Sequence, residues 1–274
     1  MPVTFKALFL WGISVDLTPL MGHPAFESAR RRIASGKRHI EAFKREVGAY
    51  AQTKPHDIRA KKNSESGLVE HKIKQLRPIP ELIEDTIFDA LCNLRSALDN
   101  ATYATAVLSG KNSPRYANFP IGDNISEVTS RASGQSADIP SDIFAFCVAL
   151  KPHKGGNDLV WALNKACNIN KHRLVIAVGT FMDVLNVYDF ELDGPYELNT
   201  SPVWDSTKNE AVFLKVPEET TVRYHLEVGL KMVFREIDMI AGKEVFATLN
   251  KIAGVVESIV SGIEAESRRI GLLA

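Results

Sequence analysis

The sequence predicts an α+β fold, in which a helical bundle of long first, second and last helices packs with an antiparallel sheet of about four to five strands. Segments near both ends carry apolar residues at alternating spacings of three and four, the pattern of a helix that lies along another helix. Residues 222–234 alternate apolar and polar side chains, which is typical of a strand with one buried face. Strands and helices do not alternate regularly, which argues against a doubly wound parallel sheet.

The first helix is expected over residues 25–51, with Pro24 at a favourable N-terminal position. Its apolar stripe contains Phe26, Ile33, Ile40 and Val47. The polar residues 53–67, rich in Lys and Ser, predict a flexible loop. Residues 68–77 mix β-branched and charged side chains, so they predict an exposed strand, which two nearby prolines end.

The second helix is expected over residues 81–108. Its buried stripe is predicted to contain Leu82, Ile83, Ile87, Leu91, Leu94, Leu98 and Ala101. Residues 110–135 predict an irregular stretch with one short helical turn. Shorter helices are expected over residues 141–150 and 159–172, each preceded by a residue that favours a helix start.

The strand pattern dominates the next part of the chain. Residues 174–181 and 211–216 are short apolar runs that predict buried strands, and residues 222–234 give the clearest alternation. The last helix is expected over residues 243–269, and it can pair with the first helix. Its stripe contains Val245, Leu249, Ile252, Val256, Ile259 and Ile263.

The first twenty residues differ from the rest of the chain. Residues 5–15 are mostly apolar, and no small-residue cleavage site of a signal peptide follows them. We expect residues 1–20 to form an extension outside the folded core, with the ordered core beginning at Met21. Residues 21–274 are then a single α+β domain. The alternative is that the first residues form a short strand packed on that domain.

The composition excludes several classes of protein. With 45% hydrophobic and 24% charged residues, the chain is neither a disordered tail nor a collagen-like repeat. Its three cysteines form no CxxC pair, which argues against a zinc site or a disulfide framework and favours buried thiols in a reducing compartment. The sequence contains no uninterrupted apolar window of about 18 residues, so we expect a cytoplasmic protein without a membrane partner.

The net charge of zero conceals an asymmetry along the chain. Residues 24–77 contain 14 Lys and Arg but 6 Asp and Glu, a net charge of +8, and residues 78–274 carry −8. We favour the interpretation that a basic helix packs on an acidic body, because that helix also has an apolar stripe to bury. The alternative is a basic arm for an anionic partner such as nucleic acid.

The most recognisable enzyme motifs are absent from the sequence. It contains no P-loop, no GxGxxG after a strand, no HExxH and no GxSxG, and its histidines show no metal-ligand spacing. We therefore expect neither a cofactor nor a metal ion. A site built from dispersed residues is still compatible with these absences.

Two helical segments carry polar residues that predict a site. Arg95, Asp99 and Tyr103 follow one another at intervals of four on the second helix. The second group, at the end of the helix over 159–172, contains Asn168, Lys171, His172 and Arg173. Because a lone buried charge is costly, we expect Asp99 to reach both Arg95 and a cation of the second group. All seven residues are binding candidates, and Arg95, Asp99 and His172 are the catalytic candidates. The alternatives are a structural ion pair and a histidine bonded at a helix end.

Four stretches carry a resemblance to a family of bacterial proteins. They are LRSALDNATY (94–103), NFPI (118–121), LKPHKGG (150–156) and DLVWALNKACNINKHRLVI (158–176). The family resembled has the motifs LRSALDHxxY, FPI, QPYxGG and LWxLxxLxNxDKHR. It has no settled activity, so the resemblance implies an architecture and a candidate site without a reaction. The chain departs from these motifs at Asn100, His153 and Asn170, where the family commonly has His, Tyr and Asp.

A weaker resemblance is to HEPN-type ribonucleases, in which an Arg is followed four to six residues later by a His on a buried helix. Arg95 and Asn100 match that spacing, but an amide does not titrate near neutral pH as His does. A separation of five residues also places the two side chains about 140° apart on a helix. The resemblance implies either a degenerate enzyme or one that relies on His172.

These observations lead to one principal interpretation and two alternatives. The principal one is a soluble bacterial binding module, a homodimer through its heptad-patterned helices, that binds an anionic ligand at Arg95, Lys171, His172 and Arg173. One alternative is a metal-independent, HEPN-like ribonuclease of the phage-defence or toxin type. The other is a nucleic-acid-binding protein that uses the basic segment 24–77, whose binding would depend strongly on salt.

Overall fold

The computed structural model describes residues 22–170, 178–199, 204–205, 207–234 and 237–273. Its helices are α2 (Glu27–Gln52), α3 (Glu81–Leu108), α4 (Ile125–Ser130), α5 (Ser141–Ala149), α6 (Asp158–Asn170) and α7 (Val245–Arg269), with the 3-10 turns η1 (Pro24–Phe26) and η2 (Arg131–Ser133). Its strands are β1 (His56–Lys62), β2 (Val69–Gln75), β3 (Val178–Asp193), β4 (Glu197–Leu198), β5 (Glu210–Val216) and β6 (Thr221–Phe234). The predicted α+β class is confirmed.

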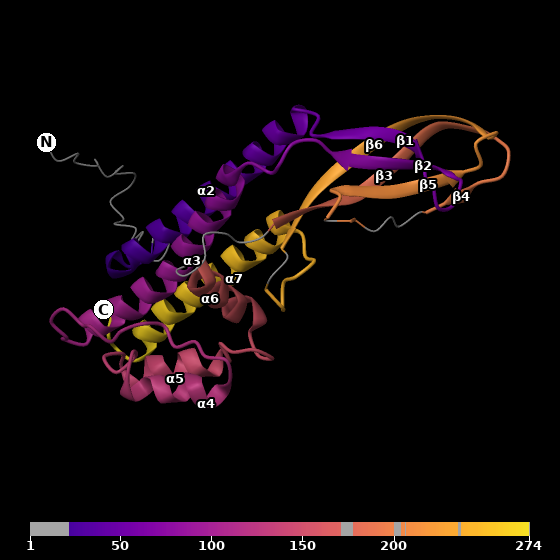
Figure 1. Ribbon diagram of the computed structural model, residues 1–274. Helices are drawn as coiled ribbons and strands as arrows, with labels where there is room; N and C mark the ends of the chain where they lie inside the picture. The colour runs from indigo at the N-terminus through magenta and orange to yellow at the C-terminus, as the bar shows by residue number, and fades with distance from the viewer. Residues whose placement is uncertain (1–21, 171–177, 200–203, 206, 235–236, 274) are drawn as a thin grey trace, which may run out of the picture.

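Helices α2, α3 and α7 lie lengthwise against one another and form the main body of the molecule (Figure 1). Their apolar stripes meet in one core, which includes Ile40, Leu94 and Val256. Leu82 is an exception to the predicted stripe, because its neighbour Ile83 is fully buried and a step of about 100° leaves Leu82 55% exposed. Because these stripes are buried against one another within one chain, their heptad pattern does not require a second copy of the chain to cover them.

Ion pairs join the basic first helix to carboxylates of the last helix, α7. The Nζ atom of Lys37 lies 2.8 Å from a carboxylate oxygen of Glu257, and Arg30 Nη1 lies 3.0 Å from Glu264. The backbone N–H of His23 also donates to Glu264, over 2.6 Å. The basic helix α2 therefore packs within the same chain, and two of its cations pair there with carboxylates of α7.

The strands form an arm, β1–β6, that projects beyond one end of the helical bundle (Figure 1). They make two antiparallel sheets, one of four strands in the order β1-β2-β5-β4 and one of two strands, β3-β6. The predicted antiparallel sheet of about four to five strands is confirmed by the four-stranded sheet, and the structure adds a second sheet of two strands. Strand β6 has 14 residues and spans roughly 45 Å, too long to be covered by the end of a bundle.

Two boundaries of the predicted strands also differ. Residues 53–67 were expected to be a loop, but they contain β1, which pairs with β2 over seven residue pairs. Strand β2 was expected to be exposed, but it lies between β1 and β5, and its His71 and Ile73 are buried. Of the strand predicted over 174–181, the residues 174–177 lie outside the described residues, and β3 continues to Asp193.

The arm has a small apolar core of its own, separate from that of the bundle. Residues of the four-stranded sheet, such as Ile73 and Phe213, pack against Leu192 and Val222 of the β3-β6 sheet. His71 Nδ1 lies 2.9 Å from the hydroxyl oxygen of Tyr224 inside this core. One face of the four-stranded sheet is therefore covered by the other sheet, which leaves its opposite face polar.

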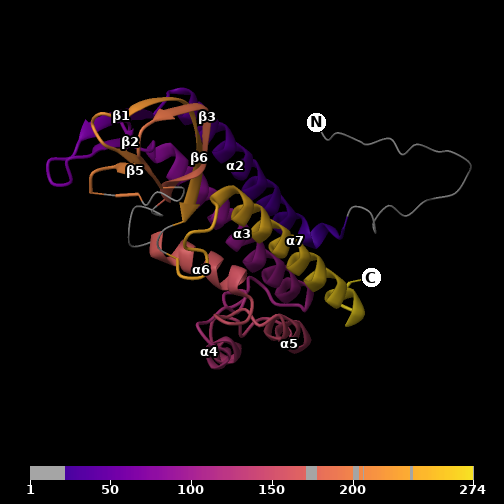
Figure 2. The same cartoon turned by 90° about the vertical axis from the view of Figure 1, so that its right-hand side faces the viewer.

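The shorter helices lie away from the arm. Helix α6 packs on α3 and α7, while α4 and α5 lie at the end of the molecule opposite the arm (Figures 1 and 2). The Asn124 side chain caps α4 by accepting from the Glu127 N–H, and Glu127 accepts from the N–H of Asp123. Residues 110–135, expected to contain one helical turn, hold α4 followed by η2.

Helix α7 is the one helix in the described part of the chain that is long and apolar enough to cross a membrane by length and composition. Its stripe, which includes Leu249, Ile252 and Val256, lies in the core between α2 and α3. Helix α7 therefore meets the criterion of length and composition with an apolar stripe that is packed inside the bundle.

Candidate functional site

The centre of the candidate site is the pair of Arg95 and Asp99 on α3. Their spacing of four residues brings the side chains together on the helix, and Arg95 Nη1 lies 2.6 Å from Asp99 Oδ1. The two side chains are 16% and 33% exposed, so the ion pair borders solvent without being immersed in it. The predicted ion pair is present.

Further hydrogen bonds tie this pair to two other segments. Arg95 Nε donates to the side-chain oxygen of Asn164 on α6 over 3.1 Å, and Arg95 Nη2 donates to the Phe119 carbonyl over 3.4 Å. Asp99 Oδ1 also accepts from the Phe119 N–H over 2.9 Å. The guanidinium therefore has three acceptors, on α3, on α6 and in the loop before α4, and these bonds fix its orientation.

The pair lies at the edge of a cavity of about 420 Å³, which we call the polar cavity. Its lining residues are Arg95, Asp99, Asn118, Phe119, Ile121, Arg131, Gln135, Asn164, Cys167 and Asn168. The volume is within the range of about 300–1,000 Å³ typical of small-molecule sites. Two guanidinium groups, one carboxylate and four amides give the cavity many hydrogen-bond donors and a small positive excess.

The second guanidinium belongs to Arg131, from η2. Arg131 Nη1 donates to the side-chain oxygen of Gln135 over 2.5 Å, which is a neutral acceptor. In the described residues no carboxylate pairs with Arg131, in contrast to Arg95. This arginine is therefore the uncompensated positive charge of the polar cavity.

A neighbouring hollow of about 390 Å³ shares Ile121, Arg131, Asn164 and Asn168 with the polar cavity. Its other charged lining residues are Asp123, Glu127 and Lys165, and Asp123 accepts from the indole N–H of Trp161 over 2.7 Å. Trp161 is otherwise packed in the core, as expected from its place on an apolar helix. The two hollows are therefore adjacent, with Arg131, Asn164 and Asn168 between them.

The structure brings some of the predicted site residues together. Asn168 lines the polar cavity with Arg95 and Asp99. Lys171, His172 and Arg173 lie outside the described residues, so the predicted contact between Asp99 and one of these cations stays a prediction.

Tyr103 is not part of the polar cavity. It is 44% exposed and lines a different, apolar hollow with Asn100 and Val107. The physical reason is the helical step, because each interval of four residues advances the side chain by about 40°, and two intervals turn it away from Arg95.

Sequence reasoning missed Arg131, Gln135 and Asn164. Asn164 precedes Asn168 by four residues, so the helical period could have revealed it as a neighbour on the same face. Arg131 and Gln135 follow α4 in a stretch expected to be irregular, and no local pattern connects them to α3.

Asn100 does not face the polar cavity either. Its side-chain amide donates to Ser28 Oγ over 2.9 Å, which directs it toward α2. The HEPN-like spacing of Arg95 and Asn100 therefore does not bring the two side chains to one site.

The described residues contain no group of three or more His, Cys, Asp or Glu side chains arranged to hold a metal ion. Comparisons of the chain with protein-family models, with curated proteins and with solved structures gave no match. The evidence for a function therefore comes from this chain's own residues.

Proposed function

We propose that this protein is a binding module for a small anionic ligand that occupies the polar cavity. The observation that carries the proposal is the pairing of a fixed guanidinium, Arg95, with an uncompensated one, Arg131, around a cavity of about 420 Å³. The amides of Asn118, Gln135 and Asn168 add neutral donors and acceptors.

The two arginines have different roles in this proposal. Arg95 is already bonded by Asp99, Asn164 and the Phe119 carbonyl, so it positions the cavity wall and offers its remaining N–H donors. Arg131 carries the net charge and contacts the anion directly. A charge-assisted hydrogen bond of this kind contributes about 1.5–3 kcal/mol, which corresponds to roughly tenfold to a hundredfold in affinity.

The proposal is tested with Arg131→Gln, which removes the cavity's uncompensated charge and leaves the Arg95–Asp99 pair in place. The matched control is Arg115→Gln, an exposed arginine outside the lining of the cavity. Inorganic phosphate and adenosine 5′-monophosphate serve as probes, followed by thermal unfolding and calorimetric titration. A probe at about 100 times its Kd should stabilise the fold by about 2.7 kcal/mol.

We expect Arg131→Gln to weaken binding of the probe by at least about tenfold, and Arg115→Gln to leave it unchanged. Equal losses in the two variants would show that the probe responds to general surface charge. If neither probe binds the unmodified protein, the proposal of an anion site in this cavity fails.

The ribonuclease alternative depends on His172, which lies outside the described residues, and Asn100 gives it no support because it bonds to Ser28. Incubation of the purified protein with total RNA in EDTA distinguishes the two proposals. Cleavage that is lost in His172→Ala would favour the ribonuclease. Binding of phosphate without cleavage would favour the binding module.

A further inference from the structure

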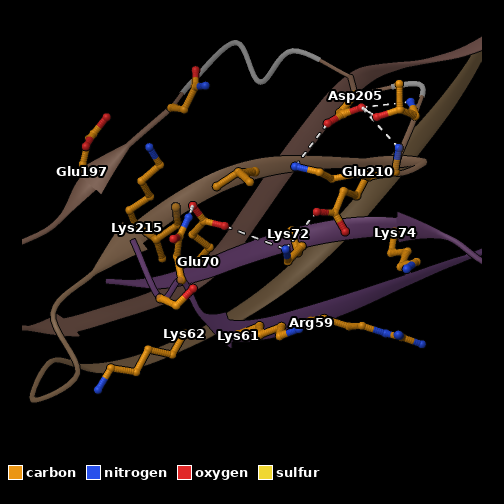
Figure 3. A pocket seen from close by; sticks show the side chains of 17 residues that line it. Arg59, Lys61, Lys62, Glu70, Lys72, Lys74, Glu197, Asp205, Glu210 and Lys215 are labelled. Carbon is orange, nitrogen blue, oxygen red and sulfur yellow. Dashed lines mark hydrogen bonds and ion pairs between the residues drawn. The ribbon is translucent and has the colours of Figure 1, made fainter. Parts of the chain in front are cut away.

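The open face of the four-stranded sheet in the arm carries a second concentration of charge, far from the polar cavity. A groove of about 870 Å³ runs over it, lined by strands β1, β2, β4 and β5 and the loops that follow β1 and β4. We call its main cations the basic face: Arg59, Lys61, Lys62, Lys72, Lys74 and Lys215. They come from three neighbouring strands, with Arg59, Lys61 and Lys62 on β1, Lys72 and Lys74 on β2, and Lys215 on β5 (Figure 3).

Strand geometry explains why these residues, apart from Lys62, share a face. Lys62 directly follows Lys61 at the end of β1, stands opposite Val69 and pairs with Glu218. Successive side chains of a strand point to opposite sides, so residues two apart in β1 and in β2 face the same way. In β2 the intervening residues, His71 and Ile73, point into the arm's apolar core. The alternation that buries one side of the sheet therefore collects Lys72 and Lys74 on the other.

The centre of the basic face is neutralised by the protein itself. Lys72 Nζ lies 2.9 Å from Glu210 and 3.8 Å from Glu70, and these three side chains are only 13–14% exposed (Figure 3). Asn63 also donates to Glu70 over 2.8 Å. This network is fixed within the sheet, so Lys72 is a structural group and contributes little to binding an external partner.

The cations around this centre are held less tightly, although three of them stand opposite carboxylates in the strand register: Lys61 and Lys215 flank Glu70, and Lys74 lies between Asp57 and Glu210. Lys61, Lys74 and Lys215 have no ion pair among the residues that the structure describes. Arg59 stands directly opposite Lys72 in the register of β1 and β2, an arrangement of like charges that destabilises a sheet unless anions offset it. Arg59 does pair with Asp57, over 2.9 Å, but both side chains are about half exposed, and such pairs contribute little.

We propose that the basic face binds the phosphate backbone of a nucleic-acid duplex. The groove's lining contains seven cations and four carboxylates, an excess of three positive charges. All of the cations but Arg59 are lysines, which act as mobile point charges suited to phosphate oxygens. Lys61 and Lys215 stand on either side of Glu70, and Lys74 lies further along β2, so a polyanion along the groove can contact all three.

The residues that line the groove also indicate which form of nucleic acid fits. Proteins that bind single strands stack the bases on aromatic side chains, and none of the described lining residues is aromatic. Recognition by this face is therefore limited to the backbone, and a duplex presents its phosphates outward without requiring base contacts. Such binding is insensitive to base sequence and strongly dependent on salt.

The test variant is Lys61→Gln/Lys74→Gln/Lys215→Gln, which removes three cations without breaking an ion pair of the described structure. The matched control, Arg38→Gln/Lys243→Gln/Lys251→Gln, removes three exposed cations outside the groove. The probe is a fluorescent DNA duplex of mixed sequence, with one of its strands alone for comparison. The affinity of each protein is measured by anisotropy over a series of salt concentrations.

Each phosphate contact contributes about 0.9 to the slope of log K against log salt concentration. We expect the arm variant to lower the magnitude of this slope by about 2.7, and the control variant to leave it unchanged. If the triple variant does not fold, each single substitution should lower the slope by about 0.9. The corresponding Lys→Arg variants should retain binding, because they keep the charge.

Three results would overturn the proposal. The first is an equal slope for the arm variant and the unmodified protein. The second is tighter binding of the single strand than of the duplex. The third is displacement of the duplex by polyglutamate at the same concentration of charge, which would identify acidic protein chains as the partner.

Discussion

The contact between α2 and α3 depends on a glycine, and this dependence gives a quantitative prediction. A Cβ atom added at Gly36 would lie 2.9 Å from Leu94 Cγ and 3.3 Å from the carbonyl oxygen of Ala90. Leu94 is fully buried, so neither the side chain nor the helix backbone is free to move away. We therefore expect Gly36→Ala to destabilise the bundle, although alanine is the better helix former.

Gly48 provides the matched control on the same helix, because an added Cβ there meets no atom within 4 Å. Gly48→Ala should stabilise the protein by up to about 1 kcal/mol through helix propensity alone. Gly36→Ala gains the same amount but incurs an overpacking cost of about 1–3 kcal/mol. The difference between the two variants isolates the packing cost, because the propensity gain is common to both.

Urea unfolding followed by far-UV circular dichroism measures the free energy of unfolding of both variants. A Leu94→Ala background should remove much of the cost of Gly36→Ala, because the clashing atom is gone, while that background itself costs about 2–5 kcal/mol. If Gly36→Ala is as stable as Gly48→Ala, α2 and α3 do not approach each other as described, and the reasoning fails.

A double-mutant cycle with Arg95→Met and Asp99→Asn should give a coupling energy of about 1–3 kcal/mol, between the values for exposed and buried ion pairs. Burial lowers the pKa of His56 and of His71 below the usual 6.5. As the pH falls below 6.5, these histidines take up protons in the unfolded chain before they do so in the folded protein. Their contribution to the free energy of unfolding is therefore fully present above that pH and is lost as the pH falls below it. Thermal unfolding between pH 8 and pH 5, roughly spanning the titration of histidine, should show this loss. Burial raises the pKa of the Cys147 thiol to about 12, so iodoacetamide should modify it only when the protein unfolds.

Each of these predictions has its own control. A coupling energy below about 0.5 kcal/mol would place Arg95 and Asp99 in the class of solvent-screened pairs. Replacing His56 and His71 with Gln should flatten the stability profile between neutral and acidic pH, and an unchanged profile would contradict the stated cause. Mass spectrometry of tryptic peptides separates Cys147 from the other two cysteines, and rapid labelling of the native protein would show that this thiol is accessible.

The sequence by itself determined the long helices. The helix predicted over 81–108 has the bounds of α3, and the last helix differs by two residues at its start. Helical periodicity is a local property, since the residues that share a face are three and four positions apart. The same local rule predicted the ion pair of Arg95 and Asp99.

The sequence determined the arm only in part. Strands β5 and β6 were predicted because each has an apolar pattern of its own, whereas most β1 side chains are exposed and the strand is held by pairing with β2. A strand of this kind carries little local signal. The division into two sheets depends on pairings between distant segments, such as Val178 with Phe234, which no window of sequence contains.

Only the tertiary structure decided which polar residues form the candidate site. It brought Asn164 and Arg131 to Arg95 from an adjacent helix and a distant turn, and it directed Asn100 and Tyr103 elsewhere. It also divided the basic segment 24–77 between α2, two of whose cations pair with carboxylates of α7, and the arm, which keeps lysines without an ion pair on an open face of the described structure. Local spacing fixes which side chains of one helix are neighbours, but contacts between elements depend on how the whole chain packs, because burial is shared among segments far apart in sequence.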